Sequence, residues 1–100
     1  MSARTSSAIQ RQVKFAPAGR IFSHSEASRL FRDVRALRGA QQIVIDLGRA
    51  EDATTSAFAQ MVLLRRWLLR SGRDLRLINL HSRAAGLFEV NRLQGVLPLA

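Results

Sequence analysis

The chain contains no cysteine and only two histidines. The absence of cysteine excludes a disulfide framework and a thiolate metal site. His24 and His81 lie far apart in the sequence without a second type of ligand at useful spacing, so we expect neither a metal nor a cofactor. No apolar run approaches the roughly 18 residues that a membrane span needs, so we expect a cytoplasmic protein without membrane insertion.

Acidic residues are also few. Seven of them face sixteen basic residues, which gives a formal net charge of +9, and all of the basic residues except Lys14 are arginine. A basic surface attracts nucleic acid, anionic lipid or an acidic protein partner. Because the arginines are scattered and almost no aromatic residues lie between them, solvated arginines are favoured over a specific nucleic-acid site.

A length of 100 residues is typical of one domain with one core. We expect residues 1–8 to form a disordered tail, since this stretch has no apolar segment of the signal-peptide type. Residues 9–100 then form a single domain.

Strand patterns alternate with helix patterns along the domain, which predicts an α/β fold in the order βαβαβα. The sheet is expected to be small and mixed or parallel, with covering helices. Strands are expected at 8–16, where Ile9, Val13 and Phe15 alternate, with a possible resumption at 19–22, and then at 41–47 and 74–80. The run at 41–47 is continuously apolar and β-branched, as in a central strand. Helices are expected at 23–39, from about 55 to 72, and after Ser82, which is a candidate N-cap.

The first helix has the clearest pattern. Ser23 is a good N-cap, and Glu26, three residues later, predicts a capping box. Gly39 is suited to the position after the helix end. The apolar stripe expected to face the core comprises Ala27, Leu30, Phe31, Val34 and Leu37.

The second helix carries two apolar arcs. The broad arc, expected to face the core, contains Phe58, Met61, Val62, Leu64, Leu68 and Leu69. Arg65 falls within that arc, so it must lie near the end of the buried zone, extend to solvent or find an acid. Leu63 and Trp67 project from the opposite side between Arg66 and Arg70, which suits either a protein interface or packing under a loop.

From about Gly19 to Leu99 the sequence resembles a STAS domain, the module shared by sulfate transporters and bacterial anti-sigma factor antagonists. "GRIFSHSEASRLFRDV" resembles the first part of the family pattern, and "LFEVNRLQGVLPL" resembles its last helix. The central segment "IVIDLGRAEDATTSAFAQMVLLRRWLLRSGRDLRLINL" is similar to the family's strand, Asp-Leu-Ser, loop, Asp-Ser-Ser-Gly-Leu, helix and second strand. The register between Asp46 and Gly72 contains no gap.

In this register the family's loop Asp falls on Thr54, its phosphorylatable Ser on Thr55, the next Ser on Ser56 and its Gly on Ala57. The resemblance implies that an anti-sigma factor, which is a serine kinase, phosphorylates Thr55, with Ser56 and Thr54 as further candidates. It also implies that the unmodified antagonist binds that kinase, freeing the sigma factor, and that a phosphatase resets the cycle. The family's acid before the acceptor is missing, and Asp52 is the nearest carboxylate before it.

The three consecutive hydroxyl residues also have a purely structural interpretation. The N–H groups at a helix start lack partners, and a hydroxyl cap there is worth about 1 kcal/mol. One cap suffices, however, so two hydroxyls remain. A phosphate on Thr55 would add nearly two negative charges at the helix start, where the helix dipole favours them.

We therefore expect a regulatory, protein-binding module and not an enzyme, since no nucleophile–base pair, paired carboxylates or phosphate-binding glycine pattern occurs. The expected function is that of an anti-sigma factor antagonist in a bacterial partner-switching pathway of transcription regulation. Alternatives are a non-switching STAS subunit of a transporter ATPase complex, or a nonspecific nucleic-acid-binding basic domain. The residues expected to contact the partner are Asp52, Thr54, Thr55, Ser56, Ala57, Leu63, Arg66, Trp67 and Arg70.

Overall fold

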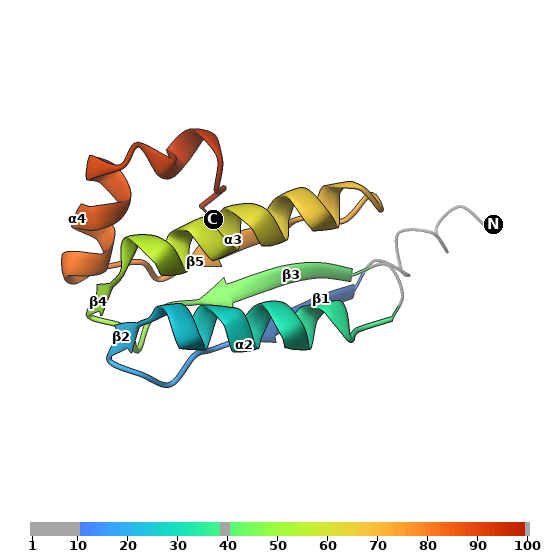
Figure 1. Cartoon of the computed structure of the whole chain (residues 1–100), viewed down its shortest axis with the longest axis horizontal. Helices are drawn as coiled ribbons and strands as arrows, with labels where there is room; N and C mark the ends of the chain where they lie inside the picture. The colour runs from blue at the N-terminus through green and yellow to red at the C-terminus, as the bar shows by residue number, and fades with distance from the viewer. Residues whose placement is uncertain (1–10, 39–40, 100) are drawn as a thin grey trace.

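The computed structural model describes residues 11–38 and 41–99 (Figure 1). The strands are β1 (Arg11–Phe15), β2 (Ile21–Phe22), β3 (Gln41–Asp46), β4 (Asp52–Ala53) and β5 (Leu75–Ile78). The helices are α2 (His24–Arg35), α3 (Thr55–Leu69) and α4 (Ser82–Val90), followed by the 3₁₀ turn η1 (Leu93–Gly95). The expectations for residues 1–8, Ile9 and Gly39 concern positions outside the described ranges.

The predicted α/β class, with a small sheet and covering helices, is confirmed. The main sheet has the order β1-β3-β5, and β2 pairs with β4 in a second, two-stranded sheet. Every strand pairing in the described ranges is parallel. The strand β3 is central as expected, because β1 and β5 flank it on both sides. Ile43 and Ile45, which share one face of this strand, are fully buried.

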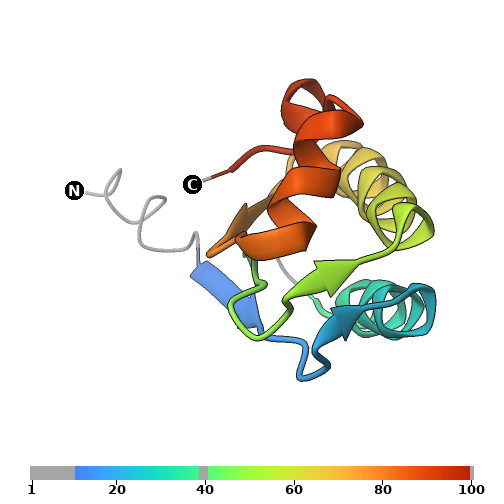
Figure 2. The same ribbon diagram turned by 90° about the vertical axis from the view of Figure 1, so that its left-hand side faces the viewer.

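Both long helices cover the same face of the main sheet, as the end-on view in Figure 2 shows. The chain moves from β1 to β3 through α2 and from β3 to β5 through α3, always in one direction across the sheet. Right-handed crossovers in one direction place every crossover helix on one side. The core therefore forms between the sheet and the two helices, and its largest fully buried side chains include Phe22, Phe58, Phe88, Met61, Leu64 and Leu68.

The start of α2 follows the predicted capping box only in part. The Ser23 hydroxyl accepts a hydrogen bond from the amide of Glu26 at 3.3 Å, as expected for an N-cap. The Glu26 carboxylate instead accepts from the amide of Gly19 at 2.9 Å. A side chain at Gly19 would place its Cβ only 2.8 Å from that carboxylate oxygen, so the Glu26 side chain would have to shift. The hydrogen bond between Gly19 and Glu26 fixes the loop before β2 against α2.

The broad arc of α3 faces the core as predicted, with one exception. Phe58, Met61, Leu64 and Leu68 are buried, but Leu69 is 48% exposed, so its assignment to the core was wrong. The helix ends at Leu69, and Gly72 turns the chain with a φ of +75°. Leu68, next to Leu69, is fully buried, so Leu69, about 100° further around the helix, projects to the side of the buried stripe.

Arg65 finds an acid. Its Nε and Nη2 donate to the two carboxylate oxygens of Asp74 at 2.8 and 3.2 Å, and its Nη1 donates to the carbonyl of Val96 at 3.1 Å. This bond pattern joins α3 to the residue before β5 and to the C-terminal segment. The hydrogen bond to Asp74 raises the pKa of Arg65.

The cap of α4 differs from the prediction. His81, and not Ser82, occupies the N-cap position, and its side chain makes no capping hydrogen bond. Ser82 has a φ of +56°, and its hydroxyl bonds to His81 Nδ1 at 2.8 Å. The apolar C-terminal segment covers one end of the core, because Leu97 is fully buried and the amide of Leu77 donates to the carbonyl of Pro98 at 2.9 Å.

We expect Arg65→Lys to lower the free energy of unfolding by about 1 kcal/mol, because lysine keeps the charge but cannot form the two parallel hydrogen bonds. Urea denaturation measures this change. The matched control is Arg66→Lys, one residue along on the exposed side of α3. Equal stability of the two variants would contradict the role of the Arg65–Asp74 pair.

Candidate functional site

The two-stranded sheet places the start of α3. The amides of Glu51 and Asp52 donate to the carbonyl of Arg20 at 2.8 and 3.2 Å, and the amide of Thr54 donates to that of Phe22 at 3.1 Å. Thr54 is therefore the last residue held by β2 and also the N-cap of α3. The following hydroxyl residues begin the helix at the end of a fixed strand.

Thr54 alone provides the side-chain cap. Its Oγ1 accepts a hydrogen bond from the amide of Ala57 at 3.1 Å, and it lies 3.3 Å from the hydroxyl of Ser56. Thr55 and Ser56 are both exposed in the first turn, and that turn contains no acidic residue. Two hydroxyl groups are thus presented to solvent at a helix start whose cap is already made.

Phe58, in the first turn, holds this end of the helix in the core. Its ring meets the ring of Phe22 edge-on at 6.2 Å between centroids and the ring of Phe88 at 5.6 Å. These three rings come from β2, α3 and α4, so one buried side chain connects the three elements around the site.

Two residues expected to contact a partner behave differently from the hydroxyl pair. Ala57 is fully buried, so its methyl group belongs to the core and its assignment to the docking surface is corrected. Asp52 is partly exposed, and its carboxylate accepts from the amide of Ala53 at 2.8 Å and lies 3.9 Å from Arg83 on α4. Within the described ranges no hydrogen bond joins Asp52 to the three hydroxyl side chains.

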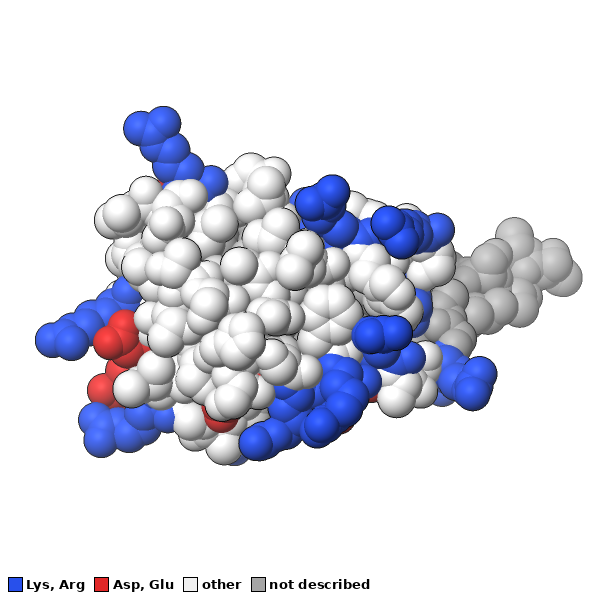
Figure 3. Space-filling model, in the orientation of Figure 1, with Lys and Arg blue, Asp and Glu red and all other residues white. Residues whose placement is uncertain are grey.

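An apolar groove adjoins the hydroxyl pair. It has a volume of about 390 Å³ and lies between α3 and the segment that follows α4. Its lining residues are Thr55, Phe58, Ala59, Val62, Leu63, Asn91 and Leu93. None of them is charged, and Figure 3 shows a broad uncharged area over the start of α3 and over α4. Asn91 and Leu93 were not foreseen, since only the packing of α4 brings them to α3.

The two apolar residues on the outer side of α3 have different surroundings. Leu63 is 50% exposed and forms part of the groove wall. Trp67 is only partly exposed and packs against the core cluster. The guanidinium carbons of Arg35 and Arg73 lie 5.9 and 5.0 Å from the centroid of its ring. Sequence spacing suggested Arg66 and Arg70 as its neighbours, whereas the guanidinium groups over its ring come from α2 and from beyond the α3–β5 turn.

A polar network holds the loop between β3 and β4. The carboxylate of Asp46 accepts from the side chain of Asn79 at 3.0 Å and from the amide of Gly48 at 2.9 Å, and Lys14 lies 3.6 Å away. The hydrogen bond from Asn79 is the main cause that lowers the pKa of Asp46, followed by the bond from Gly48. His81 Nε2 lies 3.0 Å from the carbonyl of Gly48, so both ends of the network fix the same loop.

The surroundings of His81 and the arrangement of acidic and histidine side chains complete the description of the site. His81 contacts a neighbouring serine and a backbone carbonyl, both at the surface, and no carboxylate orients its ring. In the part of the chain that the structure describes, no group of three His, Asp or Glu side chains is arranged to hold a metal ion.

The chain was compared with models of protein families, with curated proteins and with solved structures, and none of these matches it. The resemblance to STAS domains therefore stays a hypothesis that depends on the motifs of this one sequence. Among the helices of the described ranges, none has both the length and the apolar character that crossing a bilayer requires.

We expect Thr54→Ala to lower the free energy of unfolding by about 1 kcal/mol, because the Ala57 amide loses its cap. Thr55→Ala and Ser56→Ala should each stay within about 0.5 kcal/mol of the unmodified protein, since their hydroxyls are exposed. Chemical denaturation of the three variants tests this. A loss at Thr55 as large as at Thr54 would show that the cap is shared.

A pH dependence is expected from Asp46. Because folding lowers its pKa below the ordinary 3.8, its stabilising effect is present above pH 3.8 and is lost as pH falls through the lower folded value. Asp46→Asn should therefore destabilise the protein at neutral pH, and the difference should shrink in acid. Denaturation curves at several pH values measure it, with Asp33→Asn, an exposed carboxylate on α2, as the control.

Proposed function

We propose that the chain is a regulatory module that binds a protein partner at the start of α3. The observation that carries the proposal is the placement of Thr55 and Ser56, which are exposed beside an uncharged apolar groove while Thr54 makes the cap. A groove of this kind accepts apolar side chains of a partner, and the Thr55 hydroxyl on its wall can hydrogen-bond to a polar group of that partner and so orient it. The groove lies between fixed elements, so little ordering is needed on binding.

The specific role that we propose is that of an anti-sigma factor antagonist controlled by phosphorylation of Thr55. This role follows from the STAS resemblance, and the surroundings of Thr55 support it. A phosphate there would lie at the N-terminus of α3, where unpaired N–H groups and the helix dipole stabilise negative charge. The helix would stay folded, while nearly two negative charges would appear at the rim of an apolar groove. A partner that buries this rim would have to remove the phosphate from water, so it would dissociate.

A photo-activated cross-linking residue at Ser56 tests the docking site in cells of the source organism. We expect a cross-linked protein that is an ATP-binding serine kinase, because the proposed partner is both kinase and anti-sigma factor. The matched control carries the same residue at Arg49, which is also exposed but lies in the β3–β4 loop. Equal cross-linking at both positions would argue against a docking site at α3, and a transporter ATPase subunit would favour the non-switching alternative.

The same captured partner tests the switch. Incubation with ATP should add one phosphate to Thr55, located by mass spectrometry, and the modified protein should lose the partner. Thr55→Ala should keep the partner and accept no phosphate, while Thr54→Ala should still be modified. A bound kinase that leaves Thr55, Ser56 and Thr54 unmodified would remove the switch and leave the docking site standing.

A further inference from the structure

Five arginines gather at the C-terminal ends of the two long helices, far from the hydroxyl pair. This arginine cluster consists of Arg32, Arg35, Arg66, Arg70 and Arg73. The first two lie on α2, the next two at the end of α3, and Arg73 follows the turn after α3. Figure 3 shows basic side chains concentrated over these ends of α2 and α3, beside the uncharged area.

Trp67 connects two members of the cluster. Arg35 and Arg73 lie over its ring, as the distances of 5.9 and 5.0 Å to the centroid show. Arg70 follows Trp67 by three positions and so lies on the same side of α3, whereas Arg66 precedes it by one position and projects about 100° around the helix from it. The guanidinium groups of Arg35 and Arg73, from α2 and from the segment after α3, are held over one partly buried ring, which limits their freedom before any partner binds.

The cluster lacks its own counter-charges. Arg32 lies 3.8 Å from the exposed carboxylate of Asp33, and none of the other four forms an ion pair within the described ranges. Asp74, the acid that follows Arg73 directly, is bound by Arg65. Basic residues in the last turn of a helix interact favourably with the helix dipole, and this explains why arginine occurs at one or two of these positions. Like charges four residues apart, such as Arg66 and Arg70, instead repel each other.

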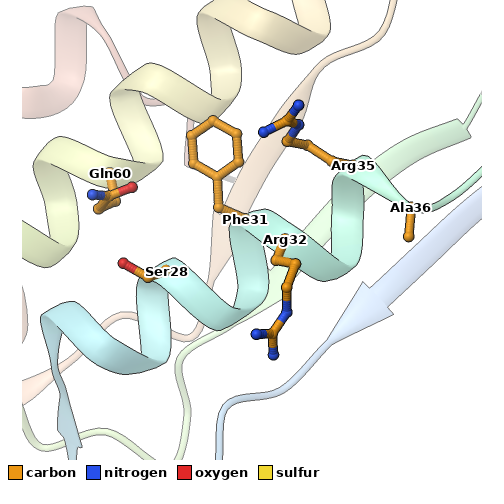
Figure 4. Close-up of a pocket in the computed structure, with 6 residues that line it drawn as sticks. All are labelled: Ser28, Phe31, Arg32, Arg35, Ala36 and Gln60. Atoms are coloured by element: carbon orange, nitrogen blue, oxygen red, sulfur yellow. The ribbon is translucent and has the colours of Figure 1, made fainter.

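A hollow lies next to the cluster between α2 and α3. It has a volume of about 530 Å³ and is lined by Ser28, Phe31, Arg32, Arg35, Ala36 and Gln60. In Figure 4 the ring of Phe31 rises from α2 toward α3 with the guanidinium of Arg35 beside it, whereas Arg32 points away to the other side of α2. The hollow thus combines an aromatic wall with a cationic rim.

These features favour one kind of ligand. Arginine binds carboxylates through two parallel hydrogen bonds, and an apolar wall between the arginines suits an apolar side chain set among those carboxylates. Nucleic acid is less well matched, because the ring of Trp67 is covered by Arg35 and Arg73 and is not free to stack on a base.

We propose that the arginine cluster and the hollow over Phe31 form a docking site for an acidic segment of a protein partner. Carboxylates of the segment pair with Arg35, Arg66 and Arg70, and one apolar side chain fills the hollow. The two arginines of α3 in this surface lie roughly 16–23 Å along the helix from Thr55, at the helical rise of 1.5 Å per residue. The inference extends the proposed protein-binding function to a second surface and does not require phosphorylation of Thr55.

Trp67 is the only tryptophan, so its fluorescence reports binding at the cluster directly. The probe is a synthetic peptide of repeating Glu-Glu-Leu, titrated into the full chain at low and at physiological salt. We expect a saturable change in the tryptophan emission. The double variant Arg35→Glu, Arg70→Glu should weaken binding at least about tenfold, which corresponds to about 1.4 kcal/mol. The variant Arg35→Gln, Arg70→Gln gives the same comparison should glutamate disturb the helix ends.

The matched control is Arg11→Glu, Arg49→Glu, which changes the net charge equally at two exposed positions outside the cluster. It should keep the affinity within about threefold. An equal loss in this control, or no emission change with the peptide, would overturn the docking site. Duplex DNA or phosphatidylglycerol vesicles that bind more tightly than the peptide at the same salt would overturn the assignment to an acidic protein. If the peptide binds as expected but the cross-linking experiment at Ser56 captures no partner, the site at the arginine cluster stands and the site at the start of α3 does not.

Discussion

The packing of Phe58 between Phe22 and Phe88 is the contact on which the arrangement of the molecule depends. The three rings lie at the corner where β2, α3 and α4 meet, and all three side chains are buried. Because Phe58 lies in the first turn of α3, this contact fixes the start of the helix more firmly than a capping hydrogen bond could. The hydroxyl groups of Thr55 and Ser56 are exposed, yet the packing of Phe58 in the core fixes the backbone that carries them.

The one-sided arrangement of α2 and α3 has a second consequence. Both helices run away from the corner that Phe58 fixes, so their C-terminal ends lie side by side at the other end of the molecule (Figure 1). The outer surface of α3 therefore changes along its length from hydroxyl and alanine through Leu63 to Arg66 and Arg70. A helix dipole favours cations at that end, and the arginines of α2 add to them. A partner lying along α3 would meet an apolar, uncharged surface first and a basic one afterwards.

Sequence patterns predicted the structure correctly where the residues of one helix or strand alone determine it. The stripe of α2, the Ser23 cap and the central position of β3 all followed from spacing and residue type. The wrong assignments were Leu69 in the core, Ala57 on the docking surface and Ser82 as the cap of α4. All three lie at helix ends, where packing against other elements and the loop geometry decide the surroundings of a side chain. The surroundings of Trp67 could not be predicted either, because Arg35 and Arg73 reach it from other parts of the chain. An acidic partner was one of three outcomes expected for Arg65, and only the turn after α3 identified Asp74 as that partner.

In the hypothetical STAS register Thr54 stands where that family has a loop Asp, and this bears on the proposed switch in two ways. As a cap the threonine is an adequate substitute, since its Oγ1 accepts from the amide of Ala57 at 3.1 Å. Electrostatically it removes a carboxylate from the residue next to Thr55, and the first turn of α3 contains no other acid. Asp52, the nearest one before it, is directed toward Ala53 and Arg83. A phosphate on Thr55 would therefore meet little electrostatic repulsion from neighbouring carboxylates. Threonine at position 54 weakens the likeness to the STAS pattern, but it also lowers the free-energy cost of adding negative charge at Thr55. The unmodified surface at the start of α3 is uncharged. Phosphorylation would therefore cause a large change in the binding free energy of a partner that buries this surface.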